Sequence, residues 1–338
     1  MKKVILNSQG QPITLSNREA KIANNLEKSV NALGYQVDIT SLTTIMKKVS
    51  EQKFFEIAPA DYLPVRVGEG AWSTQLTTYR SFSLADSFET GMLNTGANNS
   101  SLAVGDAGVD SVDIAVNNWA KQIGWTLFDL EHASKSGNWD LVTAKEKSRK
   151  KNWDLGIQKI AFIGMEGNAS VKGLLNQAGI TSNTALITKA ISSMTGTELK
   201  AFTAGVLEAY RANCNRTAMP THFVIPESDY LGLASPSNAD FHIKSTLEVL
   251  QDTFRVMTGN PSFQIKPCAY AESSISGLGV QRYALYNSEE ESLRMDIPVD
   301  YTNTLANSID NFSFQNVGYG QFTGALAYRP QELLYFDF

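Results

Sequence analysis

The spacing of hydrophobic and polar positions changes several times along the chain. In residues 16–34 the apolar side chains recur at helical spacing, and Ser16 and Glu19 form a capping-box pattern. The apolar positions of this stretch are Ile22, Leu26, Val30 and Leu33. We therefore expect an amphipathic N-terminal helix, followed by a second short helix over residues 42–52. Two prolines then interrupt the pattern, and residues 59–64 are predicted to form a linker.

From residue 71 the spacing becomes two. Residues 71–79 alternate, with many β-branched and aromatic side chains, and residues 112–127 alternate in a similar way. Between them, residues 91–101 are rich in glycine, asparagine and serine, a composition typical of a loop tip. A strand pair of this length with so few large apolar residues cannot form a core of its own. We therefore expect it to lie on another molecule, most simply a second copy of the same chain.

Helical spacing returns after residue 127. A short helix is predicted over residues 128–136, and a long one over residues 140–163, which would span about 35 Å. Residues 197–213 form another amphipathic helix, whose apolar side consists of Leu199, Phe202, Val206, Leu207 and Tyr210. The remaining predicted elements are strands over residues 221–225, 263–267 and 282–286, a helix over residues 247–257, and aromatic strands within residues 312–338.

Composition narrows the function classes. The formal net charge of −5 argues against a protein that grips nucleic acid through a basic surface. No apolar run approaches the roughly 20 residues needed to cross a bilayer, and the N-terminus lacks the apolar stretch of a signal peptide. The two cysteines, Cys214 and Cys268, are too few for a disulfide framework or a zinc site. We expect both to be free thiols in a reducing cytoplasm.

The catalytic motifs are missing from the sequence. Gly68 and Gly70 open like a dinucleotide fingerprint, but Ser73 stands where the third glycine belongs. The three histidines are scattered and form no zinc motif. We therefore predict no catalytic residue, no cofactor and no metal.

The centre of the long predicted helix is strongly basic. Its cationic residues are Lys145, Lys147, Arg149, Lys150 and Lys151. The simplest interpretation is a solvated helical face, within which Glu146 and Lys150 have the spacing of a favourable ion pair. The sharper interpretation is that this face lies against a polyanion or against a neighbour that carries carboxylates.

The order of these parts resembles that of a known family. Residues 160–164 end the long helix in glycine and are followed by Gly-Leu-Leu-Asn at residues 173–176. Residues 223–226, Phe-Val-Ile-Pro, stand before Tyr230, and residues 328–330, Tyr-Arg-Pro, stand before Tyr335. In these features the chain resembles the major capsid proteins of tailed bacteriophages with the Hong Kong 97-type fold. The likeness is greatest to a divergent capsid family once catalogued as uncharacterised.

The resemblance implies an α+β fold with named parts. These are an N-terminal arm and the start of the peripheral domain (residues 1–67), an extended loop (68–122), a peripheral domain (123–195) with a spine helix (140–163), an axial domain (196–300), and C-terminal strands that return to the peripheral domain (301–338). Such a subunit is expected to assemble with itself, as pentamers and hexamers, into an icosahedral head shell around double-stranded DNA. No catalytic site and no membrane contact are implied.

The resemblance also implies partners and contact residues. Portal, scaffolding and decoration proteins are possible partners, and assembly would take place in the bacterial host cytoplasm. The expected assembly contacts are Ser87, Phe88, Met92, Leu93 and Asn94 of the extended loop and Ile22 and Leu26 of the N-terminal helix. The five basic residues of the spine helix would face packaged DNA. Some relatives cross-link lysine to asparagine between subunits, but residues 87–110 contain no lysine, so none is expected there. A scaffold fused ahead of the arm is not expected either.

Two alternatives stay open at this point. An encapsulin-type compartment shell shares the fold and would package protein cargo in place of DNA. A cytoplasmic enzyme with an unrecognised site within residues 197–298 belongs to another class, and a monomer of 37.0 kDa in solution would favour it.

Overall fold

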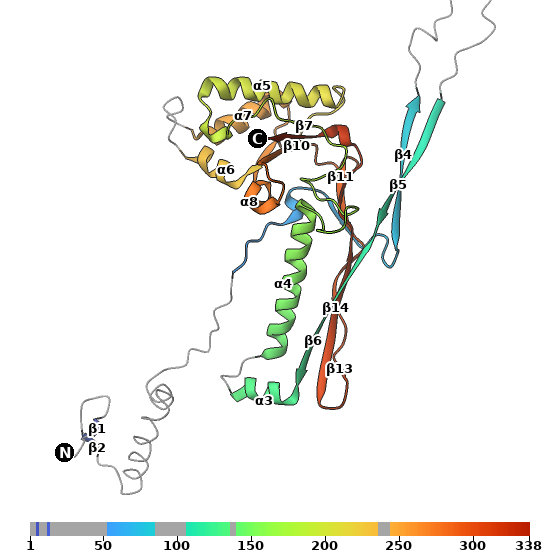
Figure 1. Cartoon of the computed structure of the whole chain (residues 1–338), viewed down its shortest axis with the longest axis vertical. Helices are drawn as coiled ribbons and strands as arrows, with labels where there is room; N and C mark the ends of the chain where they lie inside the picture. The colour runs from blue at the N-terminus through green and yellow to red at the C-terminus, as the bar shows by residue number, and fades with distance from the viewer. Residues whose placement is uncertain (1–4, 7–11, 14–52, 85–105, 136–139, 236–243) are drawn as a thin grey trace, which may run out of the picture. The chain divides into compact units, whose positions relative to one another are not determined.

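The computed structural model describes residues 5–6, 12–13, 53–84, 106–135, 140–235 and 244–338 (Figure 1). The helices predicted over residues 16–34 and 42–52, and the loop tip, lie outside these residues. The chain divides into two units, Met1–Lys53 with Leu130–Asp140, and Phe54–Asp129 with Leu141–Phe338. The first contains the strand pair of β1 (Ile5–Leu6) and β2 (Pro12–Ile13) and most of α3 (Leu127–Lys135), which confirms the short helix predicted there.

The helices of the second unit follow the sequence patterns closely. They are α4 (Leu141–Phe162), α5 (Gly196–Asn213), α6 (Glu227–Ala234), α7 (Thr246–Thr258) and α8 (Ser273–Ser276), with short 3-10 turns at Pro59–Asp61, Ile191–Ser193, Ala269–Ala271 and Pro330–Glu332. A full capping box between Thr195 and Glu198 starts α5. Ser245 caps the start of α7, and Gly259, with a left-handed backbone, ends it. Among the described residues no helix is long and apolar enough to span a bilayer.

A five-stranded sheet forms the centre of the second unit. Its order is β7 (Ser182–Asn183), β16 (Leu333–Asp337), β10 (Arg282–Tyr286), β8 (His222–Pro226) and β9 (Gln264–Cys268). Successive residues of β8 enter different cores: Phe223 packs with α5 and α7, whereas Val224 packs with the end of α4. Burial on both faces explains why the three middle strands are nearly continuous apolar runs. The last strand, β16, lies in this sheet and pairs with β10.

A long ribbon runs beside α4 (Figure 1). Strands β6 (Asn117–Thr126) and β14 (Ser313–Phe322) form ten antiparallel pairs, and β12 (Val299–Asn303) and β13 (Asn307–Ser308) line the other edge of β14. A small sheet of β15 (Ala325–Ala327), β11 (Leu293–Ile297) and β3 (Val65–Val67) continues it. The alternating stretch at residues 112–127 is therefore split: residues 112–115 pair with residues 75–78, but residues 117–126 pair with β14.

The predicted linker at residues 59–64 is wrong. Residues Pro59–Asp61 form a 3-10 turn, and Tyr62 and Leu63 are buried in the core beside α4. The Tyr286 hydroxyl donates a hydrogen bond to the Tyr62 carbonyl at 2.6 Å. The prolines shape this segment without taking it out of the core.

Candidate functional site: the hairpin and the spine helix

The feature of the second unit with the least internal support is a long hairpin. Strands β4 (Gln75–Leu84) and β5 (Asp106–Ala115) form ten consecutive antiparallel pairs, and no other strand among the described residues joins them (Figure 1). No residue of 75–81 or 107–115 is buried, and the side chains of Tyr79 and Val109 are 74% and 68% exposed. A two-stranded hairpin without a covering layer is at best marginally stable in water. This hairpin therefore depends on contacts outside itself.

One face of the hairpin is anchored near its root. The Arg294 guanidinium donates to the Thr78 hydroxyl at 3.0 Å, and Arg80 donates to the Tyr328 carbonyl at 3.2 Å. Arg80 also forms an ion pair with its cross-strand partner Asp110 at 3.2 Å. The anchored face fixes the direction in which the hairpin leaves the body, whereas Tyr79 lies on the opposite face because side chains alternate along a strand.

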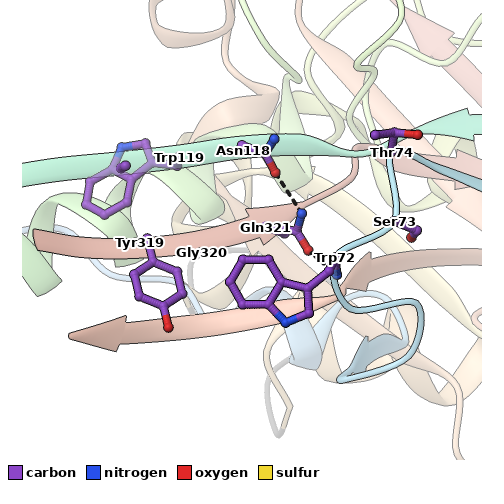
Figure 2. A pocket seen from close by; sticks show the side chains of 9 residues that line it. Trp72, Ser73, Thr74, Asn118, Trp119, Tyr319, Gly320 and Gln321 are labelled. Carbon is purple, nitrogen blue, oxygen red and sulfur yellow. Dashed lines mark hydrogen bonds between the residues drawn. The ribbon is translucent and has the colours of Figure 1, made fainter. Parts of the chain in front are cut away.

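A pocket of about 430 Å³ lies where the hairpin begins (Figure 2). It is lined by Trp72, Ser73, Thr74, Asn118, Trp119, Ala120, Tyr319, Gly320 and Gln321. The Gln321 amide accepts from the Trp72 backbone N–H at 2.7 Å and donates to Asn118 at 2.7 Å. These bonds hold Trp72 in a left-handed conformation with φ of 66°, its ring 5.8 Å from that of Tyr319. The pocket is thus a preformed aromatic site without a charged residue in its wall.

The centre of α4, the spine helix, is fixed to the ribbon by Arg149, which is 2% exposed. Its guanidinium donates to the Tyr301 hydroxyl at 2.8 Å, to the Asn303 amide oxygen at 3.0 Å, and to both the carbonyl and the amide oxygen of Asn316 at 2.9 Å. A further bond reaches the Lys121 carbonyl at 3.2 Å. One side chain therefore joins the helix to β6, β12 and β14 together.

Two glycines of β14 make this approach possible. A Cβ atom on Gly318 would stand 2.6 Å from the Arg149 Nε, and one on Gly320 would stand 2.5 Å from the Trp153 ring. The glycines are two residues apart on the strand and the helix residues four apart, so each pair shares one face of its element. Helix and strand meet at a distance that only glycine permits.

The end of the spine helix is closed by the Gly-Leu-Leu-Asn turn. The backbone N–H groups of Leu174 and Leu175 donate to the carbonyls of Ala161 and Phe162 at 2.7 and 2.9 Å. The Asn176 side chain accepts from the Gly173 N–H at 2.7 Å, which holds the turn in shape. The last carbonyls of a helix otherwise lack partners. The turn that carried the sequence resemblance thus has a definite structural role.

Comparison with known proteins decides the family. Residues 94–338, well over half of the chain, match the family model described as major capsid protein. The chain belongs to the major capsid protein family. No curated protein matches this capsid protein.

Solved structures show the same fold. The capsid of Myoviridae phage XM1 is 16% identical, with a TM-score of 0.73 over 88% of this chain and 97% of that one. The capsid of a native GTA particle is 10% identical, with a TM-score of 0.56 over 90% and 99% of the two chains. A Mycobacterium phage Ogopogo chain is 8% identical, with a TM-score of 0.54 over 89% and 98%.

The predicted α+β capsid fold and the assignment to the major capsid proteins of tailed phages are confirmed. The family match gives the capsid protein a structural role in a phage head shell and favours this assignment over a compartment shell. The domain boundaries stay predictions.

The basic residues of the capsid protein's spine helix differ from one another. Arg149 is buried, so its predicted contact with DNA is wrong: its guanidinium is fully engaged inside the subunit. Lys145 is half-buried and donates to the Gly124 carbonyl at 2.8 Å, and the half-buried Lys151 pairs with Glu56. Lys147 and Lys150 are exposed. Only these two retain the surface position that the sequence suggested for all five.

Glu146 does not form the ion pair that its spacing suggests. It accepts a hydrogen bond from the Asn316 amide, which also binds Arg149. The seven predicted assembly residues lie outside the residues whose placement is described and stay predictions; they are Ser87, Phe88, Met92, Leu93, Asn94, Ile22 and Leu26.

Sequence reasoning missed the hairpin anchor and the pocket. The sequence did contain a signal for the close approach of the helix to β14, because Gly318 and Gly320 alternate within a strand that otherwise carries aromatic and polar residues. No local pattern marked the contact of Arg294 with Thr78 or that of Trp72 with Gln321, because each pair is more than 200 residues apart in the sequence.

Proposed function

We propose that this capsid protein assembles, as pentamers and hexamers, into an icosahedral head shell that encloses double-stranded DNA and forms in the bacterial host cytoplasm. The observation that carries the proposal is the β4–β5 hairpin. It has ten paired residues on each strand and no buried residue among those whose exposure is described. Such an element is stabilised when it lies over a second subunit.

The geometry favours head-to-tail contacts. The hairpin is anchored on one face by Arg294 and Arg80, and its other face presents Tyr79 and Val109. A surface on one side of a subunit that binds a different surface of the next generates rings when the rotation closes. Contacts distributed over large buried areas, rather than one dominant residue, would then hold the shell together.

Electron microscopy and size exclusion of the full-length chain test this proposal. We expect the wild type to form closed shells, and the double variant Tyr79→Asp, Val109→Asp to remain as smaller species. Val256→Asp, on α7, is the matched control because Val256 is 83% exposed outside the hairpin. A wild type that stays a 37.0 kDa monomer overturns the shell, and a double variant that assembles like the control overturns the role of the hairpin.

We also propose that the exposed Lys147 and Lys150 lie toward the packaged DNA and lower its repulsion from the negatively charged subunit. A double Lys→Glu variant at these positions should retain less genome while empty shells still form. Lys200→Glu on α5, also an exposed lysine, is the control. Equal genome retention in the two variants refutes the assignment.

Further partners belong to the same proposal. A portal, a scaffolding protein and decoration proteins would act with the shell. Because residues 87–110 contain no lysine, no lysine cross-link is expected at that part of the loop. Particles boiled in detergent should release single chains, and a ladder of covalent oligomers would contradict this.

A further inference from the structure

The pocket at the root of the hairpin has the properties of a receptor for an uncharged apolar group. The rings of Trp72 and Tyr319 lie 5.8 Å apart in its wall, and none of its lining residues is charged (Figure 2). Trp72 remains 69% exposed although its backbone is fixed by Gln321. An immobile aromatic wall loses little conformational entropy when a partner docks against it.

A matching knob lies on the edge of the ribbon. Leu305 is 90% exposed, the highest value among the large apolar side chains whose exposure is described. It lies between β12 and β13, where Asn303 pairs with Gly318 and Asn307 with Gln315. Three residues thus face two on β14, so the edge bulges. A bulge re-aims a side chain, and the side chain in this one is exposed.

The knob is held rigidly. The Thr304 N–H donates to the Val317 carbonyl at 2.8 Å, and the Val317 N–H donates back to the Thr304 hydroxyl at 2.9 Å. The neighbours Thr304 and Ala306 are uncharged. The two nearest carboxylates along the chain are Asp300, which accepts from the Tyr301 backbone N–H, and Asp310, which accepts from the backbone N–H groups of Phe312 and Ser313. Knob and pocket therefore match in polarity as well as in rigidity.

The two features cannot meet within one subunit. Leu305 stands beside Asn316 of β14, whereas the pocket lies around Gly320 of the same strand. Four residues of strand separate these levels by about 13 Å. Strand β14 is held on both edges over this length, by β6 and by β12. Only a second copy can bring the knob to the pocket, and such a contact is head-to-tail.

We infer that Leu305 of one subunit inserts into the pocket beside the rings of Trp72 and Tyr319 of a neighbouring subunit in the shell. This inference rests on the proposed assembly of the capsid protein. It adds a specific contact, placed on the ribbon and the hairpin root, that the fold alone does not specify. The occupant is a leucine side chain of the same protein, and no other molecule is required.

Cysteine cross-linking tests the contact directly. Thr74 lines the pocket, so shells of the double variant Leu305→Cys, Thr74→Cys should form disulfide-linked oligomers under mild oxidation. Each single variant, and the pair Val256→Cys, Thr74→Cys, should not. The native Cys214 and Cys268 are free thiols but buried, so they contribute no background. Intact shells of the double variant that yield only single chains overturn the inference.

A second measurement covers the case in which the double variant does not assemble. Leu305→Asp should raise the protein concentration needed for half-assembly at least tenfold, whereas Val256→Asp should leave it within twofold. Equal values for the two variants overturn the inference even though shells form. A wild type that forms no shells overturns the proposed function, and the inference with it, so the two failures are distinguishable.

Discussion

Replacing Arg149 with methionine should strongly destabilise the subunit. The guanidinium binds Tyr301, Asn303, Asn316 and the Lys121 carbonyl, and it is 2% exposed. A hydrogen bond to a charged group contributes about 1.5–3 kcal/mol, but burial of the charge opposes this gain. The partners of Arg149 are neutral oxygens, and each one left buried without a partner costs about 1–3 kcal/mol, so the loss of several should total roughly 3–5 kcal/mol. We expect a loss within that range.

Urea unfolding of unassembled subunits, followed by tryptophan fluorescence, measures this loss. Because the slope of unfolding free energy is about 1–3 kcal/mol per molar urea in small proteins and rises with chain length, the midpoint should fall by about 1 M. Trp153 lies one helical turn from Arg149 and reports on the same contact. Lys150→Met is the control: Lys150 is exposed on the same helix, and its loss should change stability by no more than about 0.5 kcal/mol.

A lysine at position 149 separates charge from geometry. Lysine keeps the charge but lacks the planar fork of donors, so Arg149→Lys should recover only part of the loss. If Arg149→Met and Lys150→Met unfold at the same urea concentration, the network does not hold the helix to the ribbon, and the reasoning is refuted.

Three further predictions concern the same unit. Gly320→Ala should lower the free energy of unfolding by about 1–3 kcal/mol, measured by thermal unfolding, because its Cβ would overlap the Trp153 ring. The control Gly156→Ala should be neutral or stabilising, because the space around Gly156 is open. Equal effects of the two substitutions would contradict the close approach of helix and strand. Burial, aided by a nearby lysine, lowers the pKa of His222 from 6.5 to about 4. As the pH drops from about 6.5 to 4, His222 is therefore protonated in the unfolded chain but not in the folded protein, and the free energy of unfolding should fall. In His222→Gln the free energy of unfolding should change less over this pH range. Burial raises the pKa of the Cys268 thiol to about 12, so a thiol reagent at pH 8 should label it only after unfolding; rapid labelling of the native protein would exclude this environment.

The periodic elements were predictable because their signals are local. The spine helix was expected over residues 140–163 and spans Leu141–Phe162, and the strand over Arg282–Tyr286 was predicted with its observed bounds. Apolar spacing and glycine or proline boundaries decide such elements within a few residues of sequence. The apolar side predicted for α5 is likewise buried in the structure.

The errors arose where distant segments decide the outcome. The second half of residues 112–127 was assigned to the hairpin, but its partner is β14, almost 200 residues further along the chain. Arg149 was grouped with its lysine neighbours because nothing in the local sequence shows that it donates hydrogen bonds to Asn303 and Asn316. Tyr62 and Leu63 were assigned to a linker because they lie between two prolines. In each case the deciding contact is tertiary, so no window of sequence contains it.

The closed end of the spine helix joins its main chain directly to the core of the subunit. The carbonyls of Ala161 and Phe162 accept hydrogen bonds from the backbone N–H groups of Leu174 and Leu175, whose side chains are fully buried. Tension along the helix axis is therefore transferred into the core through the main chain. Side-chain substitutions on the helix surface can then alter charge without altering stiffness. A shell built from such subunits would keep its mechanical strength while the exposed residues of this helix change.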